Sequence, residues 1–335
     1  MKLATTAALW PVRLGRRFLP CNERRIETAL AFVGLAALAL SAGPAIIAGL
    51  GEPEAATLAA PVAQAAPSDP AASGSGRRGA TSSAAIAHHG WAAGAYGGVA
   101  DTLDSTVRIV NPGRTELTIS DFPWLGRPFK APPYYGVRIQ RWSGDMLGGM
   151  LDFTHAKALG KTEATGTFKG THNGKPMPEK ARMVDVFNNF EFSHGHNMLT
   201  LNGMLRGLPL FGLARPYVGA GGGISLPHTE IGFKADNART YEYQYAGIVG
   251  QALAGLEVRI GPATIFLEYK FSYAPYDVPL SHTYMGGLLV TDLWRQFTAW
   301  RTGEAPPGGR LTTLLQTHHA IAGAMYNVPR PISAR

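Results

Sequence analysis

Apolar and polar residues alternate along most of the chain in segments of about ten residues. In the segment 263–275, Leu267 and Tyr269 fall on one face of an extended chain. Glu268 and Lys270 fall on the other face. A period of two residues predicts β-strands. We predict eight of them, at 91–101, 133–142, 148–158, 190–206, 214–228, 244–260, 263–275 and 315–328.

The gaps between the eight predicted segments alternate in length. Three gaps are short enough for tight turns, at 143–147, 207–213 and 261–262. The four others are long, at 102–132, 159–189, 229–243 and 276–314. Short turns on one side of a membrane and long loops on the other are typical of outer-membrane barrels. We therefore predict an all-β fold, an eight-stranded antiparallel transmembrane β-barrel with short periplasmic turns and long extracellular loops.

Charged side chains recur on the face of these segments that a small barrel turns inward. They are Arg138, Asp152, Glu268 and Lys270, two charges of each sign. Side chains fill the lumen of an eight-stranded barrel, so charges there need partners of opposite sign. We predict that these residues form a structural ionic network and that the opposite, apolar face contacts lipid.

The beginning of the chain has the composition of an export signal. Basic residues precede an apolar stretch at about 28–50, and the small-residue motif Ala-Gln-Ala follows at 63–65. We predict that the signal is cleaved; a retained signal anchor is the alternative, because the apolar stretch is long enough to span a bilayer. The predicted organisation is an export segment at 1–65, a disordered Ala/Pro/Ser/Gly-rich linker at 66–90, the barrel at 91–328 and a C-terminal tail at 329–335.

Composition narrows the choice of partner. The net charge is +8, but the Lys and Arg residues form no run of the kind that binds nucleic acid, so we expect no nucleic-acid partner. One cysteine, Cys21, excludes an internal disulfide bond and a thiolate metal cluster. The scattered positive charge fits a phosphate-rich membrane surface, and we expect a monomer in the outer membrane of a Gram-negative bacterium.

Five short strings in the barrel region are distinctive. They are APPYYGVR at 131–138, DFTHAK at 152–157, FSHG at 192–195, RPYVGAG at 215–221 and EYKFSY at 268–273. Together they resemble the lipid A oxidase family of outer-membrane proteins described in rhizobia, over the region from about Trp91 to Tyr326. The resemblance implies O₂-dependent oxidation of the proximal glucosamine of lipid A to 2-aminogluconate, with hydrogen peroxide as by-product. It thus names lipid A or lipopolysaccharide of the outer leaflet as the partner and O₂ as a co-substrate.

Histidines and acids gather at the predicted outer ends of the strands. Loop symmetry places His155 opposite His194, although both share a face with residues that should contact lipid; a bulge at Gly195 would re-aim this strand. The predicted catalytic residues are His155, His194, Glu191 and Asp152. For a divalent metal, the predicted ligands are His155, His194 and His196. Glu191 or Asp152 would add the carboxylate of a two-histidine, one-carboxylate site of the kind used in O₂ chemistry. The alternative is a set of interfacial histidines that only meet phosphate.

Basic side chains at the same level are predicted to recognise the substrate through charge-assisted hydrogen bonds to phosphate. They are Arg127, Lys130, Lys157, Arg182 and His228. A solvated loop surface is the alternative for the loop members. The chain has no G-x-G-x-x-G motif between a strand and a helix, which argues against a flavin or NAD on a Rossmann unit.

Two other functions remain open at this point. One is a small, non-enzymatic porin-family barrel with a structural or ligand-binding role. The other is a lipid A deacylase, which would use a Ser/His pair with a carboxylate. Ser193 and His194 are adjacent in the sequence, so regular strand geometry puts them on opposite faces and argues against such a pair.

Overall fold

The computed structural model describes residues 90–236 and 238–328. The predicted export segment, its cleavage, the linker up to residue 89 and the C-terminal tail lie outside these residues. The described part is all-β, with two short helices. None of its helices has both the length and the apolar character needed to cross a membrane.

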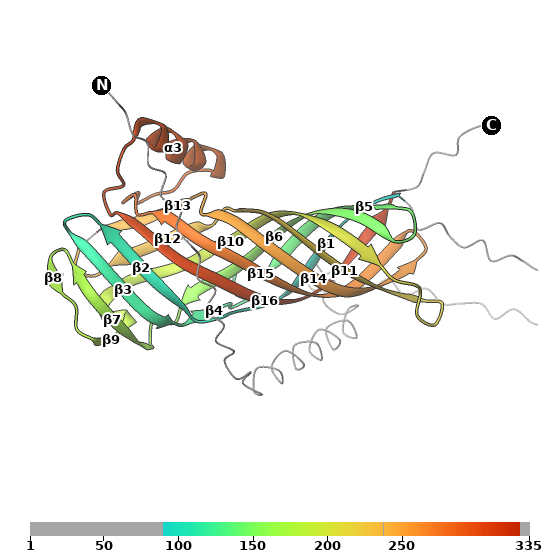
Figure 1. Ribbon diagram of the computed structural model, residues 1–335, viewed down its shortest axis with the longest axis horizontal. Coiled ribbons are helices and arrows are strands. Elements are labelled where there is room, and N and C mark those ends of the chain that lie inside the picture. The colour runs from blue at the N-terminus through green and yellow to red at the C-terminus, as the bar shows by residue number, and fades with distance from the viewer. Residues whose placement is uncertain (1–89, 237, 329–335) are drawn as a thin grey trace, which may run out of the picture.

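The main sheet closes on itself (Figure 1). Around the ring, the strands are β1 (Gly90–Thr102), β5 (Tyr135–Ser143), β6 (Leu147–Gly160), β10 (Phe187–Arg206), β11 (Ala214–Ser225), β14 (Gly247–Ile260), β15 (Ala263–Pro279) and β16 (Arg310–Asn327). Each strand pairs antiparallel with its neighbours, and β16 pairs with β1 to complete the ring. Each predicted segment overlaps one of these strands, so the pattern of alternation located them correctly.

The four long connections are not the irregular loops that the sequence analysis expected. They contain β2 (Ser105–Asn111), β3 (Thr115–Phe122), β4 (Trp124–Leu125), β7 (Thr165–His172), β8 (Lys175–Pro176), β9 (Lys180–Arg182), α2 (Met183–Val186), β12 (His228–Phe233), β13 (Arg239–Tyr243) and α3 (Leu289–Thr302). β2 pairs with the start of β16, and β12 pairs with the start of β10, so one end of the ring is extended outward. This end is on the left in Figure 1.

The extended end has an apolar core that explains why the connections fold. Val107 and Ile109 of β2 and Leu117 and Ile119 of β3 are fully buried against aromatic side chains such as Phe190. Two alternating strands that bury one face in this way gain roughly 1.5–3 kcal/mol for each large apolar side chain. The long connections therefore form strands where loops were predicted, because their sequences contain the same alternation as the ring strands, in shorter segments.

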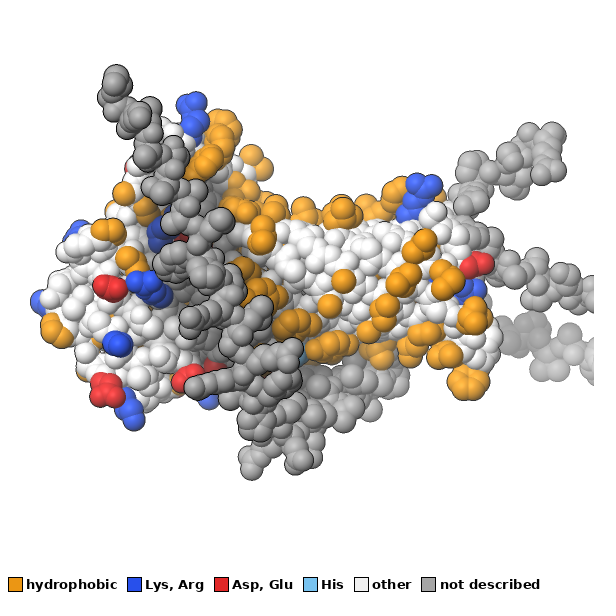
Figure 2. All heavy atoms as spheres, in the orientation of Figure 1, with side chains coloured by type: hydrophobic (Ala, Val, Ile, Leu, Met, Phe, Trp, Pro, Cys, Tyr) orange, Lys and Arg blue, Asp and Glu red, His pale blue; other side chains and the backbone are white. Residues whose placement is uncertain are grey.

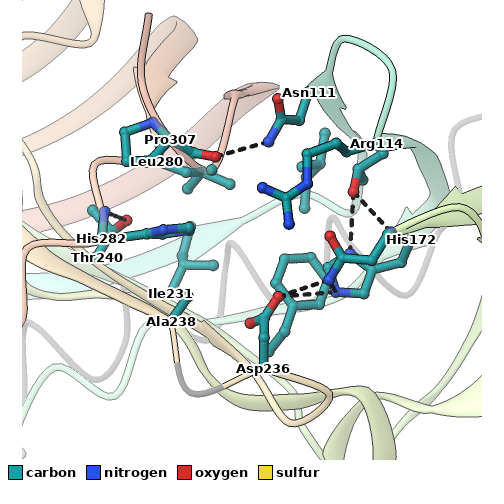
Figure 3. A pocket seen from close by; sticks show the side chains of 15 residues that line it. Asn111, Arg114, His172, Ile231, Asp236, Ala238, Thr240, Leu280, His282 and Pro307 are labelled. Carbon is teal, nitrogen blue, oxygen red and sulfur yellow. Dashed lines mark hydrogen bonds and ion pairs between the residues drawn. The ribbon is translucent and has the colours of Figure 1, made fainter.

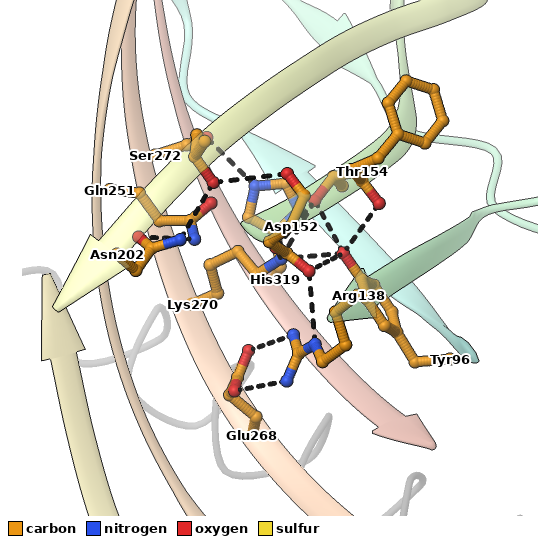
Figure 4. Close-up of polar contacts among 12 residues, drawn as sticks. Tyr96, Arg138, Asp152, Thr154, Asn202, Gln251, Glu268, Lys270, Ser272 and His319 are labelled. Atoms are coloured by element: carbon orange, nitrogen blue, oxygen red, sulfur yellow. Dashed lines mark hydrogen bonds and ion pairs between the residues drawn. The ribbon is translucent and has the colours of Figure 1, made fainter. Parts of the chain in front are cut away.

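The other half of the ring holds the predicted ionic network (Figure 4). Arg138 donates two hydrogen bonds of 2.9 Å to Glu268, and its Nε lies 3.2 Å from Asp152 Oδ1. Lys270 Nζ lies 2.5 Å from Asp152 Oδ2, and Tyr96 OH donates to Asp152 Oδ1 over 3.0 Å. All of these side chains are buried. The network prediction is confirmed, and each charge in it is paired.

The outside of the ring is apolar. Leu201 and Ile248 are each 68% exposed although neither is polar. The apolar belt, as we call this surface, comprises Val137, Ile139, Leu151, Leu201, Leu205, Val218, Ile224, Ile248, Leu256, Ile260, Tyr269 and Tyr273. In Figure 2, hydrophobic side chains run along the cylinder, and the charged side chains visible in that view gather toward its two ends.

Candidate functional site

A bulge in β10 re-aims the residues that the sequence analysis singled out. Phe192 pairs with Ala158 of β6, and His196 pairs with Ala156, so three residues of β10 face a single residue of β6. Gly195 lies in this bulge with a φ of 140°. A Cβ there would lie 2.2 Å from Asn197 Nδ2, so only glycine fits. The bulge that the sequence allowed at Gly195 is thus present, and it re-aims the strand.

Because of the bulge, His155 pairs with Asn197 and not with His194 as predicted. Its Nδ1 lies 2.8 Å from Asn197 Oδ1, and its ring stacks on Tyr135 with centroids 4.8 Å apart. His155 lies on the outer face, as its alternation with Leu151 indicated, but it is only 4% exposed. His155 is therefore covered by neighbouring side chains, whereas the sequence predicts that it is exposed to lipid.

Strands β10, β12 and β13 bring a group of polar side chains together on the outside of the ring. Phe190 and Phe192 belong to the internal apolar core, so Glu191 between them faces outward. Glu191 is directly opposite Glu230 in the pairing of β10 with β12, and Glu230 is opposite Tyr241 in the pairing of β12 with β13. The outer-wall cluster, as we call this group, comprises Glu191, Ser193, His194, His228, Glu230, Arg239 and Tyr241.

His194 lies at the centre of the outer-wall cluster, and its side chain is 45% exposed. Its Nδ1 is 3.9 Å from Glu230 Oε2 and 3.3 Å from Ser193 Oγ. Its ring centroid is 4.9 Å from that of His228 and 5.5 Å from that of Tyr241. The cluster therefore presents an accessible imidazole flanked by a carboxylate and a hydroxyl.

Arg239 closes the opposite side of the cluster. Its guanidinium is paired with Glu230 and lies 4.3 Å from the centroid of the Tyr241 ring. Arg239 is thus the ion-pair partner of Glu230, whereas Glu191 has no ion-pair partner among the residues described.

The ionisable groups of this cluster have shifted pKa values. Burial, followed by the negative charge of Glu230, raises the pKa of Glu191, although a hydrogen bond from Ser193 opposes the shift. Burial, followed by the charge of His194, lowers the pKa of His228 to about 4. At neutral pH His228 is therefore neutral, and the affinity of Glu191 for a proton is higher than that of an exposed carboxylate. Such an arrangement suits proton transfer.

The predicted substrate-binding cations differ in their surroundings. Lys157 Nζ donates to the backbone oxygens of Lys130 and Ala131 over 2.7 and 3.0 Å, so it holds the β4–β5 loop in place. This loop carries exposed Arg127 and Lys130, and Lys130 is close enough to Glu191 for its charge to oppose part of the rise in the pKa of that carboxyl group. Arg182 of β9 makes two hydrogen bonds of 3.1 Å to Asp185. Of these cations, exposed Lys130 thus lies near the cluster, and Arg127 is exposed in the same loop.

Two predicted residues lie inside the ring, away from this surface. Asp152 belongs to the buried ionic network and is fully buried, so the prediction that it joins His155 and His194 was wrong in its geometry. Alternation explains this, since Asp152 and His155 are three positions apart and occupy opposite faces of β6. His196 is also internal, where it bonds to Tyr276 OH.

The three predicted metal ligands are consequently not brought together. His155 bonds to Asn197, His194 belongs to the outer-wall cluster, and His196 faces the interior. Within residues 90–236 and 238–328, no three His, Cys, Asp or Glu side chains are arranged so that they could hold a metal ion. The donor set therefore does not fit the predicted metal.

Sequence reasoning missed the members that β12 and β13 contribute, namely Glu230, Arg239 and Tyr241. The segment TEIGF at 229–233 alternates, but the region had been assigned to a long loop and could not be placed beside β10. The argument against a Ser193–His194 contact was also wrong. The bulge breaks the regular alternation there, and the two side chains are hydrogen-bonded.

A separate hollow lies at the extended end of the ring (Figure 3). It encloses about 450 Å³, including space open to solvent, and Arg114, His172, Asp236 and His282 are among the residues that line it. His172 Nε2 lies 3.4 Å from Asp236 Oδ2, and the His172 ring stacks on Phe233 with centroids 3.9 Å apart. None of the residues predicted from the sequence as site residues lines this hollow.

The candidate functional site is therefore the outer-wall cluster. It contains the predicted residues Glu191, His194 and His228, and it borders the loop that carries Arg127 and Lys130. No protein-family model matches the sequence, and no curated protein matches it.

Proposed function

We propose that the ring is an eight-stranded transmembrane β-barrel of a bacterial outer membrane and that the outer-wall cluster is the active site of a lipid A oxidase. The barrel part of the proposal is supported by the apolar belt outside and the paired charges inside. Aromatic side chains flank the belt, with exposed Trp91 and Tyr326 near one end and Tyr135 and Tyr245 toward the other. Aromatic girdles of this kind mark the two interfaces of a membrane barrel.

The position of the outer-wall cluster is the observation that carries the functional proposal. It faces outward, on the strands that continue directly from the apolar belt, and neither into the ring nor into the hollow at the extended end. A substrate that reaches it from the side must be amphiphilic, with its apolar part against the belt. Lipid A has its sugars at this level and its acyl chains below, and the loop cations Arg127 and Lys130 suit its phosphate or carboxylate groups.

The type of reaction follows from the resemblance of the five strings to the lipid A oxidase family, with O₂ as oxidant. The open-chain aldehyde of the proximal glucosamine, O₂ and water give the carboxylic acid and hydrogen peroxide. The C1–H bond of the hydrated aldehyde breaks, its electron pair reduces O₂, and two protons complete the peroxide. Glu191 accepts the proton of the C1 hydroxyl, for which its raised pKa suits it. His194 hydrogen-bonds the sugar beside it.

A lipid A deacylase is the second candidate, favoured by the 3.3 Å contact between Ser193 Oγ and His194 Nδ1. Hydrolases with a Ser/His pair use one ring nitrogen for the nucleophile and the other for the orienting carboxylate. Here Glu230 and Ser193 both approach the same nitrogen, Nδ1. This geometry disfavours a relay, and the oxidase is therefore the better-supported function.

The direct test uses purified full-length protein in detergent with lipid A that lacks the 1-phosphate. We expect O₂ uptake and equimolar hydrogen peroxide release, both lost in Glu191→Gln. Release of fatty acid without hydrogen peroxide would contradict the oxidase proposal and support the deacylase. No change in the lipid, with protein that migrates as a folded barrel, would contradict both enzymatic proposals and favour the non-enzymatic barrel.

A further inference from the structure

Helix α3 has its polar side chains against the strands and its apolar side chains outward. Asp292 Oδ2 accepts a hydrogen bond of 3.1 Å from the backbone N–H of Tyr243. Arg295 Nη1 donates to Glu242 Oε2 over 2.7 Å. Gln296 bonds both backbone groups of Tyr245, at 2.7 and 2.9 Å. The contact of α3 with β13 and the residues that follow it is therefore polar, the reverse of a surface helix in a water-soluble domain.

The opposite face of α3 is unusually apolar for an exposed surface. Trp294 is 68% exposed and Trp300 is 76% exposed. They share this face with Val290 and Phe297, and the preceding loop adds Met285 and Leu288. Contiguous apolar patches of this kind mark contact with a partner or a membrane.

The surroundings of α3 identify the partner as lipid. The helix stands beside β13 on the flank of the ring, where Figure 1 shows it projecting from the cylinder and Figure 2 shows hydrophobic side chains over it. Exposed Tyr245 lies just before β14, and Ile248 near the start of β14 belongs to the apolar belt. The apolar face of α3 therefore continues a surface that already faces outward on the ring.

We infer that α3 lies in the outer leaflet of the membrane, with Trp294, Phe297 and Trp300 among the acyl chains and its polar face clamped to β13. This rests on the proposed transmembrane barrel. An amphipathic helix with Trp and Phe on one face and Arg on the other occupies the boundary between headgroups and chains. Arg301, in its last turn, is exposed at the level where it meets anionic headgroups.

The helix also borders the outer-wall cluster. Tyr243, whose N–H is bonded by Asp292, packs on His228 with ring centroids 4.7 Å apart. The charge of Asp292 also acts on His228, where it opposes part of the lowering of the pKa that burial causes. A helix fixed in the outer leaflet therefore sets the depth at which the cluster meets a lipid headgroup.

Nitroxide labels in reconstituted full-length protein test this inference. In a Cys21→Ser background, single cysteines replace Trp294 or Trp300, with Leu201→Cys as a lipid reference and Lys175→Cys of β8 as a water reference. The vesicles contain phosphatidylcholine and phosphatidylglycerol. The accessibility of each label to O₂, which partitions into lipid, is compared with its accessibility to a water-soluble nickel chelate.

We expect the labels at 294 and 300 to match the label at 201, with O₂ accessibility several-fold above nickel accessibility. If 201 is in lipid while 294 and 300 match 175, the inference about α3 is wrong and the barrel proposal stands. If 201 also matches 175, the transmembrane proposal is wrong and the inference fails with it. Thr298→Cys, on the helix flank, is the matched label, and its ratio is expected to lie between the two references.

Discussion

Arg138 and Glu268 form a two-pronged ion pair inside the ring, with both N–O distances at 2.9 Å. They belong to β5 and β15, strands that are not neighbours, so the pair joins separate parts of the wall. Asp152 and Lys270 complete the set of charges. Burial makes each of these charges dependent on its partner, because a buried charge without a counter-ion is costly.

Removing one partner of this pair is expected to destabilise the barrel strongly. Glu268→Ala leaves the Arg138 guanidinium buried with one fewer carboxylate, and we expect a loss of about 3–5 kcal/mol in the free energy of unfolding. Glu116→Ala breaks the exposed pair with Arg108 and is the matched control, with an expected loss below about 1 kcal/mol. Urea titration of the folded protein in vesicles measures both, and equal losses would contradict the structural role of the network.

The bulge at Gly195 is expected to be necessary for activity. Gly195→Ala places a Cβ 2.2 Å from Asn197 Nδ2 at a φ of 140°, so either Asn197 moves away from His155 or the bulge rearranges. Gly250→Ala is the matched control, because nothing lies within 4 Å of its Cβ position. We expect Gly195→Ala to lose at least about tenfold in rate and Gly250→Ala to keep its rate, by analogy with other displaced catalytic groups. Full activity of both variants would show that the bulge is not needed for activity.

The free energy of unfolding is expected to decrease as the pH is lowered, over a range set by the pKa of His228. Its pKa in the folded protein is about 4, below its ordinary value of 6.5, so the unfolded chain binds the proton more tightly. The favourable contribution is complete above pH 6.5 and is lost as the pH falls through 4. The urea midpoint should therefore decrease over this range, and less so in His228→Gln. An identical decrease in both proteins would show that His228 is not the responsible group.

The pH dependence of oxidation tests the role of Glu191 as a base. Its pKa is raised above the ordinary 4.5, so the rate should rise with pH through a pKa above that value. Glu191→Gln should remove this rise and lower the rate about 10²-fold or more, as expected for loss of a general base. Glu163→Gln, an exposed carboxylate in the β6–β7 connection, is the matched control and should behave as wild type. If the rate of Glu191→Gln still rises with pH, the titrating group is a residue other than Glu191.

The ring and its internal charges could be predicted from the sequence, but the strands that extend one end of the ring could not. Alternation such as that of Leu267 and Glu268 reports which face of a strand is buried, which is a local property. The pairing of β12 with β10 depends on contacts between distant segments, and single short strands in long connections give a weak local signal. Because this pairing was not predicted, Glu230 and Tyr241 were not recognised as neighbours of Glu191.

The candidate site was predicted in part for the same reason. Glu191, His194 and His228 were placed at the correct end, because strand direction follows from the order of turns and loops. Asp152 was grouped with them by height, although alternation puts it on the inner face. His196 was grouped with His194 because regular alternation puts both on one face, and the bulge separates them. His155 was separated from His194 by the bulge, whose register shift has no reliable signal in a single sequence beyond the glycine itself.

The central claim is that the outer-wall cluster oxidises lipid A in the outer leaflet. Mass spectrometry of lipid A from cells that express the wild-type protein, with and without O₂ and beside Glu191→Gln, tests it most directly. We expect a gain of one oxygen atom on the proximal sugar only for wild type in the presence of O₂. An unchanged lipid in aerated wild-type cells, or the same gain without O₂ or with Glu191→Gln, would contradict it.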